Sequence, residues 1–537
     1  MVDDSASAAP PDASAAHAAP PRWRAEPRTD VPIALLVSVF VVAACGLVYE
    51  LIAGATASYL LGDSVLQFST VIGAYLFAMG IGSWLSRHLL RDLAGHFLRI
   101  ELMIGLIGGF MAIALYLLHA YAPAAFRPVL YGLIFVIGAL VGLEIPLVMR
   151  LLRQHYALKD LVSQVLTFDY LGALLVAVAF PLLLVPQLGM IRTGLFFGLA
   201  NAIVAAWACW LFRERLIRPW AHGAATLASI AALGAGFAAA DHITTFAEEG
   251  LYLHRIVYAE STPFQRIVVT QGQGDLRLYL NRNLQFSSRD EHRYHEALVH
   301  PVMLAHPAPR RVLILGGGDG LAAREVLRHP AVERITLVDL DPRMTTLFAT
   351  LPALAALNGG ALSSPKVTIV NDDAFTWLEH AQDLFDIAIV DLPDPTNFSL
   401  GKLYTTSFYG LLASRVAASG FAVIQTTSPL YARRSFWTVA ETLEAAGWRS
   451  YPYHTTVPSF GVWGYIAAAR RPLPLDAAVA ALAAHPERAP RFLTPALLPS
   501  LFEFPIDMQR VPAAVNRLHD QVLVHTYEAE WGKAPEH

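Results

Sequence analysis

The first part of the chain consists of long apolar runs separated by short polar connections. Between Val31 and Ala240, seven such runs of roughly 18 to 22 residues are long enough to cross the hydrocarbon layer of a bilayer as helices. They cover residues 31–52, 66–86, 99–119, 129–149, 164–185, 193–212 and 222–240. The pattern predicts a multi-span α-helical membrane domain over residues 31–240. The last run is the weakest, because Ala and Gly dominate it and contribute little transfer free energy.

Basic residues gather in alternate connections of this domain. The clusters are Arg87, Arg91 and Arg99, then Arg150, Arg153 and Lys159, then Arg213, Arg215 and Arg218. The positive-inside rule places these clusters and the N-terminal tail in the cytoplasm. Seven true spans would then deliver everything after residue 240 to the opposite side. If the last run lies in the interface or packs within the bundle, the rest of the chain stays inside.

After about Tyr252 the pattern becomes that of a water-soluble domain. Alternating stretches at 266–269 and 276–280 predict a β-hairpin region over residues 250–300. Apolar strands alternate with helical patterns over residues 301–470, which predicts a doubly wound parallel sheet covered on both faces. The expected strands are 311–315, 335–338, 367–370, 386–390 and 421–425. Residues 471–537 predict a helical extension, with helices at 477–484 and 511–530.

The composition agrees with this division and excludes several classes of protein. Of the 537 residues, 55% are hydrophobic and 15% charged, and the mean hydropathy is +0.45, which is too apolar for a wholly soluble chain. A formal net charge of −4 without a basic patch argues against nucleic-acid binding. Cys45 and Cys209 lie in apolar runs, so a disulfide framework or a cysteine metal site is not expected. Residues 1–30, rich in Ala, Pro, Ser and Asp, predict a disordered tail rather than a cleaved signal sequence.

Acidic residues follow the strands of the predicted sheet. The strand 311–315 runs into Gly316-Gly317-Gly318-Asp319-Gly320 and then a helix over 321–329, a turn that lets backbone approach a ligand closely. The next strand ends at Asp339, where a ribose would be bound. Two later strands end at Asn371-Asp372-Asp373-Ala374 and at Asp391-Leu392-Pro393-Asp394-Pro395. Ligands of such sheets bind outside the carboxyl ends of the strands, so these carboxylates are expected to converge on one crevice.

This set of carboxylates fits a nucleoside with a cationic co-substrate better than a dinucleotide, whose pyrophosphate it would repel. The alternative is that individual members, such as Asp339 and Asp373, only close turns or cap helices.

Residues 255–470 resemble the spermidine synthase family, the polyamine aminopropyltransferases. The resemblance rests on Thr262-Pro263-Phe264-Gln265, on Arg289-Asp290-Glu291 with Tyr294-His295-Glu296, on the glycine turn with Arg324-Glu325, and on Asp391 through Pro395 with Leu403-Tyr404. The apolar half is similar to that of the membrane-fused branch, through residues 45–50 and 79–82. The resemblance implies a Rossmann-like, class I methyltransferase-like fold and a homodimer or larger assembly.

It also implies an activity: transfer of an aminopropyl group from decarboxylated S-adenosylmethionine to putrescine or a related amine, giving spermidine and methylthioadenosine, with no metal or other cofactor. Carried over position by position, it implies that Asp391 is the proton acceptor with Tyr294 beside it. The implied donor-binding residues are Gln265, Gly316, Gly318, Asp339, Asp373 and Ala374, and the implied polyamine-binding residues are His295, Asp319 and Asp394. The chemistry requires such an acceptor, because a protonated amine has no lone pair with which to displace a sulfonium.

The chain departs from the family pattern at two places near this site. The segment 396–402 is longer than usual and lacks the Gly-Pro pair that usually follows the second aspartate. Where many members have a tyrosine near the amine, this chain has Phe460, which cannot donate a hydrogen bond. Tyr453 and Tyr465 lie close in sequence.

Other functions stay open from the sequence. Glu50, Glu144 and Asp169 fall in or beside apolar runs, where they could form a polyamine path or be paired or protonated structural groups. The chain could therefore be a polyamine transporter or sensor, and the fold would also serve an S-adenosylmethionine-dependent methyltransferase. Tyr294-His295-Glu296 with Asp391 and Asp394 favour an amine acceptor. Because the donor is a cytosolic metabolite, we expect a multi-pass protein of the cell membrane with a cytoplasmic catalytic domain.

Overall fold

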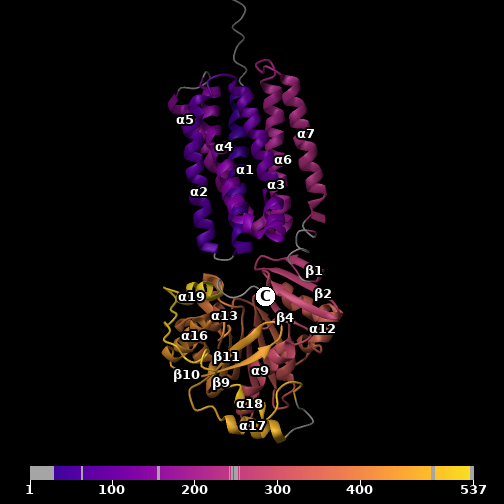
Figure 1. Cartoon of the computed structure of the whole chain (residues 1–537), viewed down its shortest axis with the longest axis vertical. Helices are drawn as coiled ribbons and strands as arrows, with labels where there is room; N and C mark the ends of the chain where they lie inside the picture. The colour runs from indigo at the N-terminus through magenta and orange to yellow at the C-terminus, as the bar shows by residue number, and fades with distance from the viewer. Residues whose placement is uncertain are drawn as a thin grey trace, which may run out of the picture.

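The computed structural model describes residues 30–61, 64–153, 158–240, 242–243, 246, 252, 254–484 and 490–531. They form a helical bundle stacked end to end on an α/β domain (Figure 1). The expected tail, residues 1–30, lies outside the described residues except for Asp30, at which the first helix begins.

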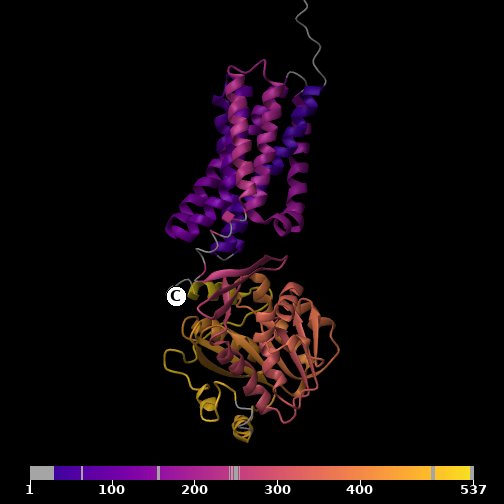
Figure 2. The ribbon, with the colours of Figure 1, turned by 90° about the vertical axis from the view of Figure 1, so that its right-hand side faces the viewer.

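Seven long helices build the bundle within residues 30–240, and each corresponds to one predicted apolar run. They are α1 (Asp30–Leu61), α2 (Ser64–Leu85), α3 (Leu93–Tyr121), α4 (Pro123–Leu152), α5 (Leu158–Ala179), α6 (Val185–Leu211) and α7 (Pro219–Ala238). They lie side by side and run along the long axis of the molecule (Figures 1 and 2).

By length and hydropathy, six stretches of the described residues are apolar enough to cross a membrane. One of them, Lys159–Leu211, has 53 residues and contains both α5 and α6. As a single helix it would be about 80 Å long, far more than the ~30 Å of a hydrocarbon layer. The chain is instead broken at Gly189, whose φ is +71°, so this stretch makes two passes along the bundle.

Small residues allow the helices to pack closely, as is usual for apolar bundles. A Cβ atom added to Gly198 on α6 would lie 2.7 Å from the carbonyl oxygen of Gly105 on α3. A Cβ atom on Gly82 of α2 would lie 1.9 Å from the carbonyl oxygen of Ala139 on α4. At these glycines the backbones of neighbouring helices therefore approach one another closely.

The bundle interior contains carboxylates. Glu144 is buried, while Glu50 and Asp169 are half-buried. Glu101 on α3, which the sequence analysis did not single out, is fully buried, and neither of its carboxylate oxygens has a hydrogen-bond partner among the described residues. The polyamine path stays a prediction.

Two sheets form the second part. Four antiparallel strands, in the order β1-β2-β3-β4, make the smaller one: β1 (Arg255–Ser261), β2 (Arg266–Gly272), β3 (Asp275–Leu280) and β4 (Asn283–Ser287). Helix α9 (Glu291–Ala305) then leads into the larger one.

The larger sheet has seven strands in the order β10-β11-β9-β8-β5-β6-β7. The five predicted strands are confirmed and pair in parallel: β5 (Arg311–Gly316), β6 (Arg334–Asp339), β7 (Val367–Asn371), β8 (Phe385–Asp391) and β9 (Val416–Thr426). Two strands that were not predicted, β10 (Arg449–Val457) and β11 (Gly461–Ala469), add an antiparallel edge to this parallel sheet.

The strands of this sheet are apolar on both faces because helices cover both. Val312 and Ile314 of β5 belong to the core under α9 and α10 (Leu321–Leu327). Leu313 and Leu315, which point the other way, belong to the core under α13 (Ala374–His380), α15 (Thr406–Arg415) and α16 (Arg433–Ala445). The remaining helices on this sheet are α11 (Pro342–Thr350) and α12 (Pro352–Leu357). The second part is thus a Rossmann-like doubly wound domain.

The C-terminal extension contains α17 (Leu475–Ala484), α18 (Leu497–Ser500) and α19 (Val522–Trp531). The predicted helix over 511–530 is wrong in its first half. There the backbone N–H of Asn516 donates a hydrogen bond to Oγ1 of Thr442. Its side-chain amide donates to the carbonyl oxygens of Gly401 and Tyr404. These tertiary hydrogen bonds replace the local bonds of a helix.

Candidate active site

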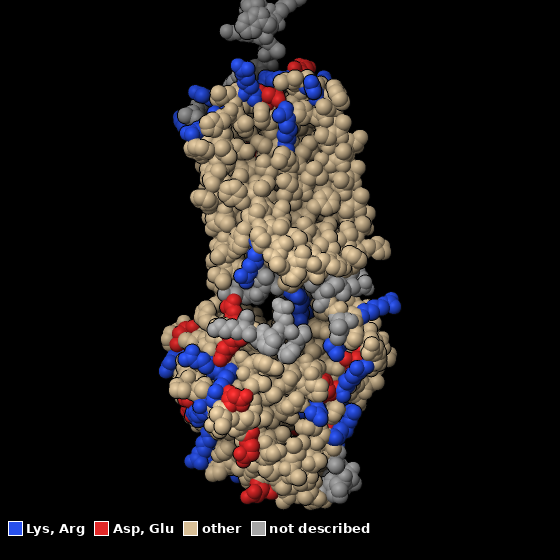
Figure 3. All heavy atoms as spheres, in the orientation of Figure 1, with Lys and Arg blue, Asp and Glu red and all other residues tan. Residues whose placement is uncertain are grey.

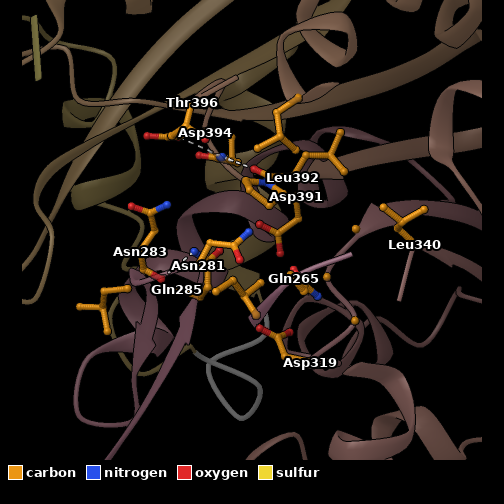
Figure 4. A pocket seen from close by; sticks show the side chains of 18 of the residues that line it. Gln265, Asn281, Asn283, Gln285, Asp319, Leu340, Asp391, Leu392, Asp394 and Thr396 are labelled. Carbon is orange, nitrogen blue, oxygen red and sulfur yellow. Dashed lines mark hydrogen bonds between the residues drawn. The ribbon is translucent and has the colours of Figure 1, made fainter. Parts of the chain in front are cut away.

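A pocket of about 920 Å³ opens at the carboxyl ends of β5, β6, β7 and β8. The predicted convergence of carboxylates is confirmed, because every predicted site residue lines this pocket: Gln265, Tyr294, His295, Gly316, Gly318, Asp319, Asp339, Asp373, Ala374, Asp391 and Asp394. In Figure 4, Asp391 is drawn between Asp394 on one side and Gln265 and Asp319 on the other.

Backbone N–H groups orient Asp339 at the end of β6. Its Oδ2 atom accepts a hydrogen bond from the Gly318 N–H at 3.0 Å, and its Oδ1 atom accepts one from the Asp341 N–H at 3.0 Å. Burial raises the pKa of Asp339 to about 6. The neighbouring Gln265 donates from Nε2 to Oδ2 of Asp341 at 3.1 Å. The glycine turn and the carboxylate are therefore built as one rigid unit.

Asp373 caps a helix and also lines the pocket. Its Oδ1 atom caps α13 by accepting the N–H groups of Phe375 and Thr376 at 3.0 and 3.1 Å. Its Oδ2 atom faces the Lys402 ammonium at 2.8 Å. Burial alone would raise the pKa of Asp373, but the Lys402 ammonium and the two N–H groups lower it. It is a helix cap and a charged wall of the pocket at once.

The centre of the pocket is a carboxylate held by a phenol. Tyr294 on α9 donates from its hydroxyl to Oδ1 of Asp391 at 2.6 Å. Burial raises the pKa of Asp391, although His295 and the Tyr294 hydroxyl act in the opposite direction. Nearby, Asp319 accepts the Leu321 N–H at 2.9 Å, and burial raises its pKa to about 6.

Glu291 favours the protonated form of His295 in this site. Its Nδ1 atom lies 2.9 Å from Oε2 of Glu291, which also pairs with Arg324 at 2.9 Å. Burial alone would lower the pKa of His295, but Glu291 raises it to about 9. The protonated ring can donate from Nε2 but cannot accept a hydrogen bond from an ammonium group. Its implied contact with the polyamine stays a prediction, and its charge offsets those of Asp319 and Asp391.

The far end of the pocket surrounds Asp394. Its Oδ2 atom accepts the Tyr527 hydroxyl at 2.8 Å and its Oδ1 atom accepts Nε2 of Gln425 at 3.3 Å. Burial raises the pKa of Asp394 to about 6. Gln425 is itself fixed, because its Oε1 atom accepts the Trp463 indole N–H at 3.1 Å.

Neither nearby tyrosine replaces the hydroxyl that Phe460 lacks. Tyr453 and Tyr465 are fully buried, and their hydroxyls donate to the carbonyl oxygens of Ala297 and Tyr294. Phe460 itself lines the pocket.

The unusual segment 396–402 also lines the pocket and forms a short helix, α14 (Phe398–Gly401). Asn397 caps it by accepting the Leu400 N–H at 3.0 Å. Lys402 follows directly, so the segment places the ammonium group that pairs with Asp373.

The residues of this site that sequence reasoning missed include Gln425, Trp463, Tyr527 and Trp531. The spacing of Tyr527 and Trp531, four residues apart in a predicted helix, places both on one helix face. That pattern gave no indication of what the face contacts.

The pocket is suited to a cationic ligand. Five aspartates line it, against His295, Arg277 and Lys402, and each of these three basic residues is paired with a carboxylate. Within the part of the chain that the structure describes, no group of three His, Cys, Asp or Glu residues could hold a metal ion.

The Rossmann-like fold and the acidic pocket at its strand ends are those expected of an enzyme for a nucleoside and a cationic co-substrate. Residues 291–475 match the spermine/spermidine synthase domain. The chain is 55% identical over 507 residues to polyamine aminopropyltransferase 2 of Ralstonia nicotianae, covering 93% of this chain and 98% of that one. It is 48% identical over 500 residues to a polyamine aminopropyltransferase of Leptospira interrogans, covering 93% and 99%. The chain therefore belongs to the polyamine aminopropyltransferase family.

The solved structures include a similar one, a spermidine synthase in complex with the transition-state analogue AdoDATO. It is 24% identical, with a TM-score of 0.44, and covers 47% of this chain and 86% of that one.

Proposed function

We propose that this enzyme transfers the aminopropyl group of decarboxylated S-adenosylmethionine to a diamine such as putrescine, giving spermidine and methylthioadenosine. The observation that carries the proposal is the Asp391 carboxylate, whose Oδ1 atom accepts the Tyr294 hydroxyl at 2.6 Å. The residues implied to bind the nucleoside donor lie on one side of it in the pocket, and Asp394 lies on the other.

In this proposal the nucleoside lies over the glycine turn. Asp339 binds the ribose hydroxyls, because both of its oxygens are already oriented by backbone N–H groups. Asp373 and Ala374 hold the adenine, and Gln265 closes the same side. Asp319 and Asp394 bind the positive charges of donor and acceptor.

The reaction is a displacement at carbon. The amine nitrogen attacks the propyl carbon bonded to the sulfonium, the C–N bond forms, and the C–S bond breaks with its electron pair going to sulfur. Asp391 accepts the proton that the nitrogen loses. Because the sulfonium is a good leaving group, holding the two substrates in line supplies most of the remaining acceleration.

The test is an assay of purified full-length protein with decarboxylated S-adenosylmethionine and a panel of diamines and triamines. Methylthioadenosine and the new amine are measured by mass spectrometry, with Asp391→Asn as the control. Turnover that the variant lacks supports the proposal. Amine binding without turnover by folded protein would support a sensor or transporter instead, and methyl transfer from S-adenosylmethionine would support a methyltransferase.

The pH profile gives an independent check. Burial raises the pKa of Asp319 and Asp394 to about 6 and also raises that of Asp391. A protonated carboxyl group can neither accept the proton nor attract an ammonium group, so kcat/KM for the amine should be high above pH 6 and fall below it. Measured from pH 5 to 8 on protein that circular dichroism shows to be folded, an acid limb near pH 4, the ordinary Asp range, would contradict this assignment.

We also propose that α1 to α7 span a membrane. Their hydropathy and length support this, and so do the large apolar side chains that they expose, which include Leu76, Phe77, Leu174, Leu175, Ile203, Trp210 and Leu227. Lys and Arg are sparse along the visible side of the bundle and gather at the end remote from the catalytic domain (Figure 3).

The number of passes bears on which side of the membrane the catalytic domain lies. With seven passes, α1 begins at the end of the bundle where the basic connections lie, and α7 ends next to the catalytic domain. The positive-inside rule then favours a catalytic domain outside the cytoplasm, whereas a cytosolic donor favours one inside. The cytoplasmic placement stays a prediction that rests on the donor.

Two single-cysteine variants test both points in a background in which Cys45 and Cys209 are replaced. Glu214→Cys lies in the connection before α7, and Pro472→Cys is exposed beyond the larger sheet. An odd number of spans requires that a membrane-impermeant maleimide label only one of them in intact cells. If the catalytic domain is cytoplasmic, residue 214 is labelled in intact cells. Residue 472 is then labelled only after the cells are permeabilised. The reverse pattern would place the catalytic domain outside, and equal labelling would contradict seven spans.

A further inference from the structure

The C-terminal helix α19 reaches the same pocket as the predicted site. Its residues Tyr527 and Trp531 line the pocket, although they follow Asp394 by more than 130 residues in the chain. We propose that α19 completes the amine-binding half of the active site, with Tyr527 positioning the amine and Trp531 limiting the length of acceptor that fits. This inference rests on the proposed function.

Tyr527 supplies a hydroxyl at the end of the pocket where Phe460 supplies none. It donates to Oδ2 of Asp394 at 2.8 Å, while Gln425 holds Oδ1. The two donors fix the plane of the carboxylate that would receive the ammonium group of the acceptor. Removing the Tyr527 hydroxyl takes one hydrogen bond from a largely buried carboxylate, which is costly for a charged group.

Aromatic rings form a continuous wall beside this carboxylate. The ring centroids of Phe460 and Trp463 are 5.1 Å apart, those of Trp463 and Trp531 are 6.4 Å apart, and those of Tyr527 and Trp531 are 6.0 Å apart. Such a wall accommodates the methylene chain of a polyamine and attracts its ammonium groups through the ring faces. Trp531 lies in this wall between Trp463 and Tyr527, and its indole N–H donates to Oγ1 of Thr427 at 2.8 Å.

The helix that carries these side chains is anchored at both ends. At its start, the Leu523 N–H donates to Oδ1 of Asn516 at 3.1 Å. At its end, Glu530 accepts the N–H groups of Arg434 and Ser435, both at 2.9 Å, and so caps the first turn of α16. The register of α19 is thereby fixed, with Tyr527 and Trp531 facing the pocket.

The helix also contacts the segment that distinguishes this chain. His525 packs edge-on against Phe398 of α14, with ring centroids 5.5 Å apart. The longer 396–402 segment and α19 therefore form one wall of the pocket together.

The first test is Tyr527→Phe, with Tyr409→Phe as the matched control. Tyr409 is buried and does not line the pocket, and its hydroxyl has no hydrogen-bond partner among the described residues. We expect Tyr527→Phe to raise KM for the amine at least tenfold, with kcat and KM for the donor changed less than threefold. Tyr409→Phe should change none of these. Equal KM values for the two variants would overturn the role of Tyr527.

Calorimetric binding of spermidine to protein saturated with methylthioadenosine measures the same contact without turnover. Tyr527→Phe should weaken this binding at least tenfold, and unchanged binding would refute the inference. If the wild-type protein binds spermidine through Tyr527 but catalyses no transfer, the proposed reaction is refuted while the role of Tyr527 in amine binding stands.

The second test concerns acceptor length. Trp531→Ala should raise the ratio of kcat/KM for a triamine to that for a diamine at least tenfold, whereas Trp531→Phe, which keeps a ring, should leave it near the wild-type value. Thermal melting and methylthioadenosine binding confirm that each variant is folded. A ratio that does not move in folded Trp531→Ala would remove Trp531 from the proposal.

Discussion

Asp391→Asn should lower kcat by about a thousandfold, within the range of 10²–10⁴ that a positioned acid or base contributes. The amide has nearly the same shape, and its oxygen can still accept the Tyr294 hydroxyl that now lies 2.6 Å from Oδ1. What it loses is the ability to take the proton from the attacking nitrogen. The donor-binding residues are unaffected, so KM for decarboxylated S-adenosylmethionine should stay within about twofold, because ground-state binding of the donor is retained.

Steady-state and single-turnover rates of methylthioadenosine release measure this effect. Asp372→Asn is the matched control, since Asp372 also follows a strand of the sheet but is exposed and does not line the pocket. It should keep the wild-type rate. An Asp391→Asn variant with a kcat within threefold of wild type would show that another group accepts the proton.

Gly316→Ala should destabilise the protein by about 3 kcal/mol or more and abolish most activity, since it combines left-handed backbone strain with a steric clash. Gly316 has a φ of +81°, and an added Cβ atom would lie 2.1 Å from the carbonyl oxygen of Asp391. The backbone of β8 would have to move to relieve this overlap. That movement would displace the proton acceptor itself.

Thermal and urea unfolding of the detergent-solubilised protein, with the activity assay, test this prediction. Gly410→Ala makes the same change inside helix α15, where nothing lies within 4 Å of the added atom. It should stabilise the protein by about 0.5–1 kcal/mol, because Ala is the better helix former. Equal stabilities for the two variants would mean that the turn at Gly316 is not constrained as described.

The aspartates at the strand ends were predictable because each directly follows an apolar strand in the sequence. An apolar strand followed by Asp339 or Asp391 fixes both where the side chain lies and which edge of the sheet it joins. The edge hairpin was harder to predict. Pro452 lies within β10 and weakens the strand pattern, yet it is compatible with an edge position such as that of β10.

The amine end of the pocket could not be predicted in the same way. Gln425, Tyr527 and Trp531 reach it through tertiary contacts, which no periodicity or motif in the sequence indicates. The predicted helix over 511–530 illustrates the limit, since its second half is a helix while Asn516 holds its first half in an irregular path through bonds to distant segments. Helix propensity depends only on the local sequence, so it does not include the free energy of such tertiary hydrogen bonds.

The position of α19 has a consequence for how the enzyme is made. The pocket takes side chains from Tyr527 and Trp531, which follow the glycine turn at Gly316 by more than 200 residues. During synthesis the apolar bundle and the glycine turn leave the ribosome before the last wall of the pocket, so the nascent chain has no finished amine site until α19 has been made. A chain cut before α19 would keep the donor side of the pocket and lack part of the amine side.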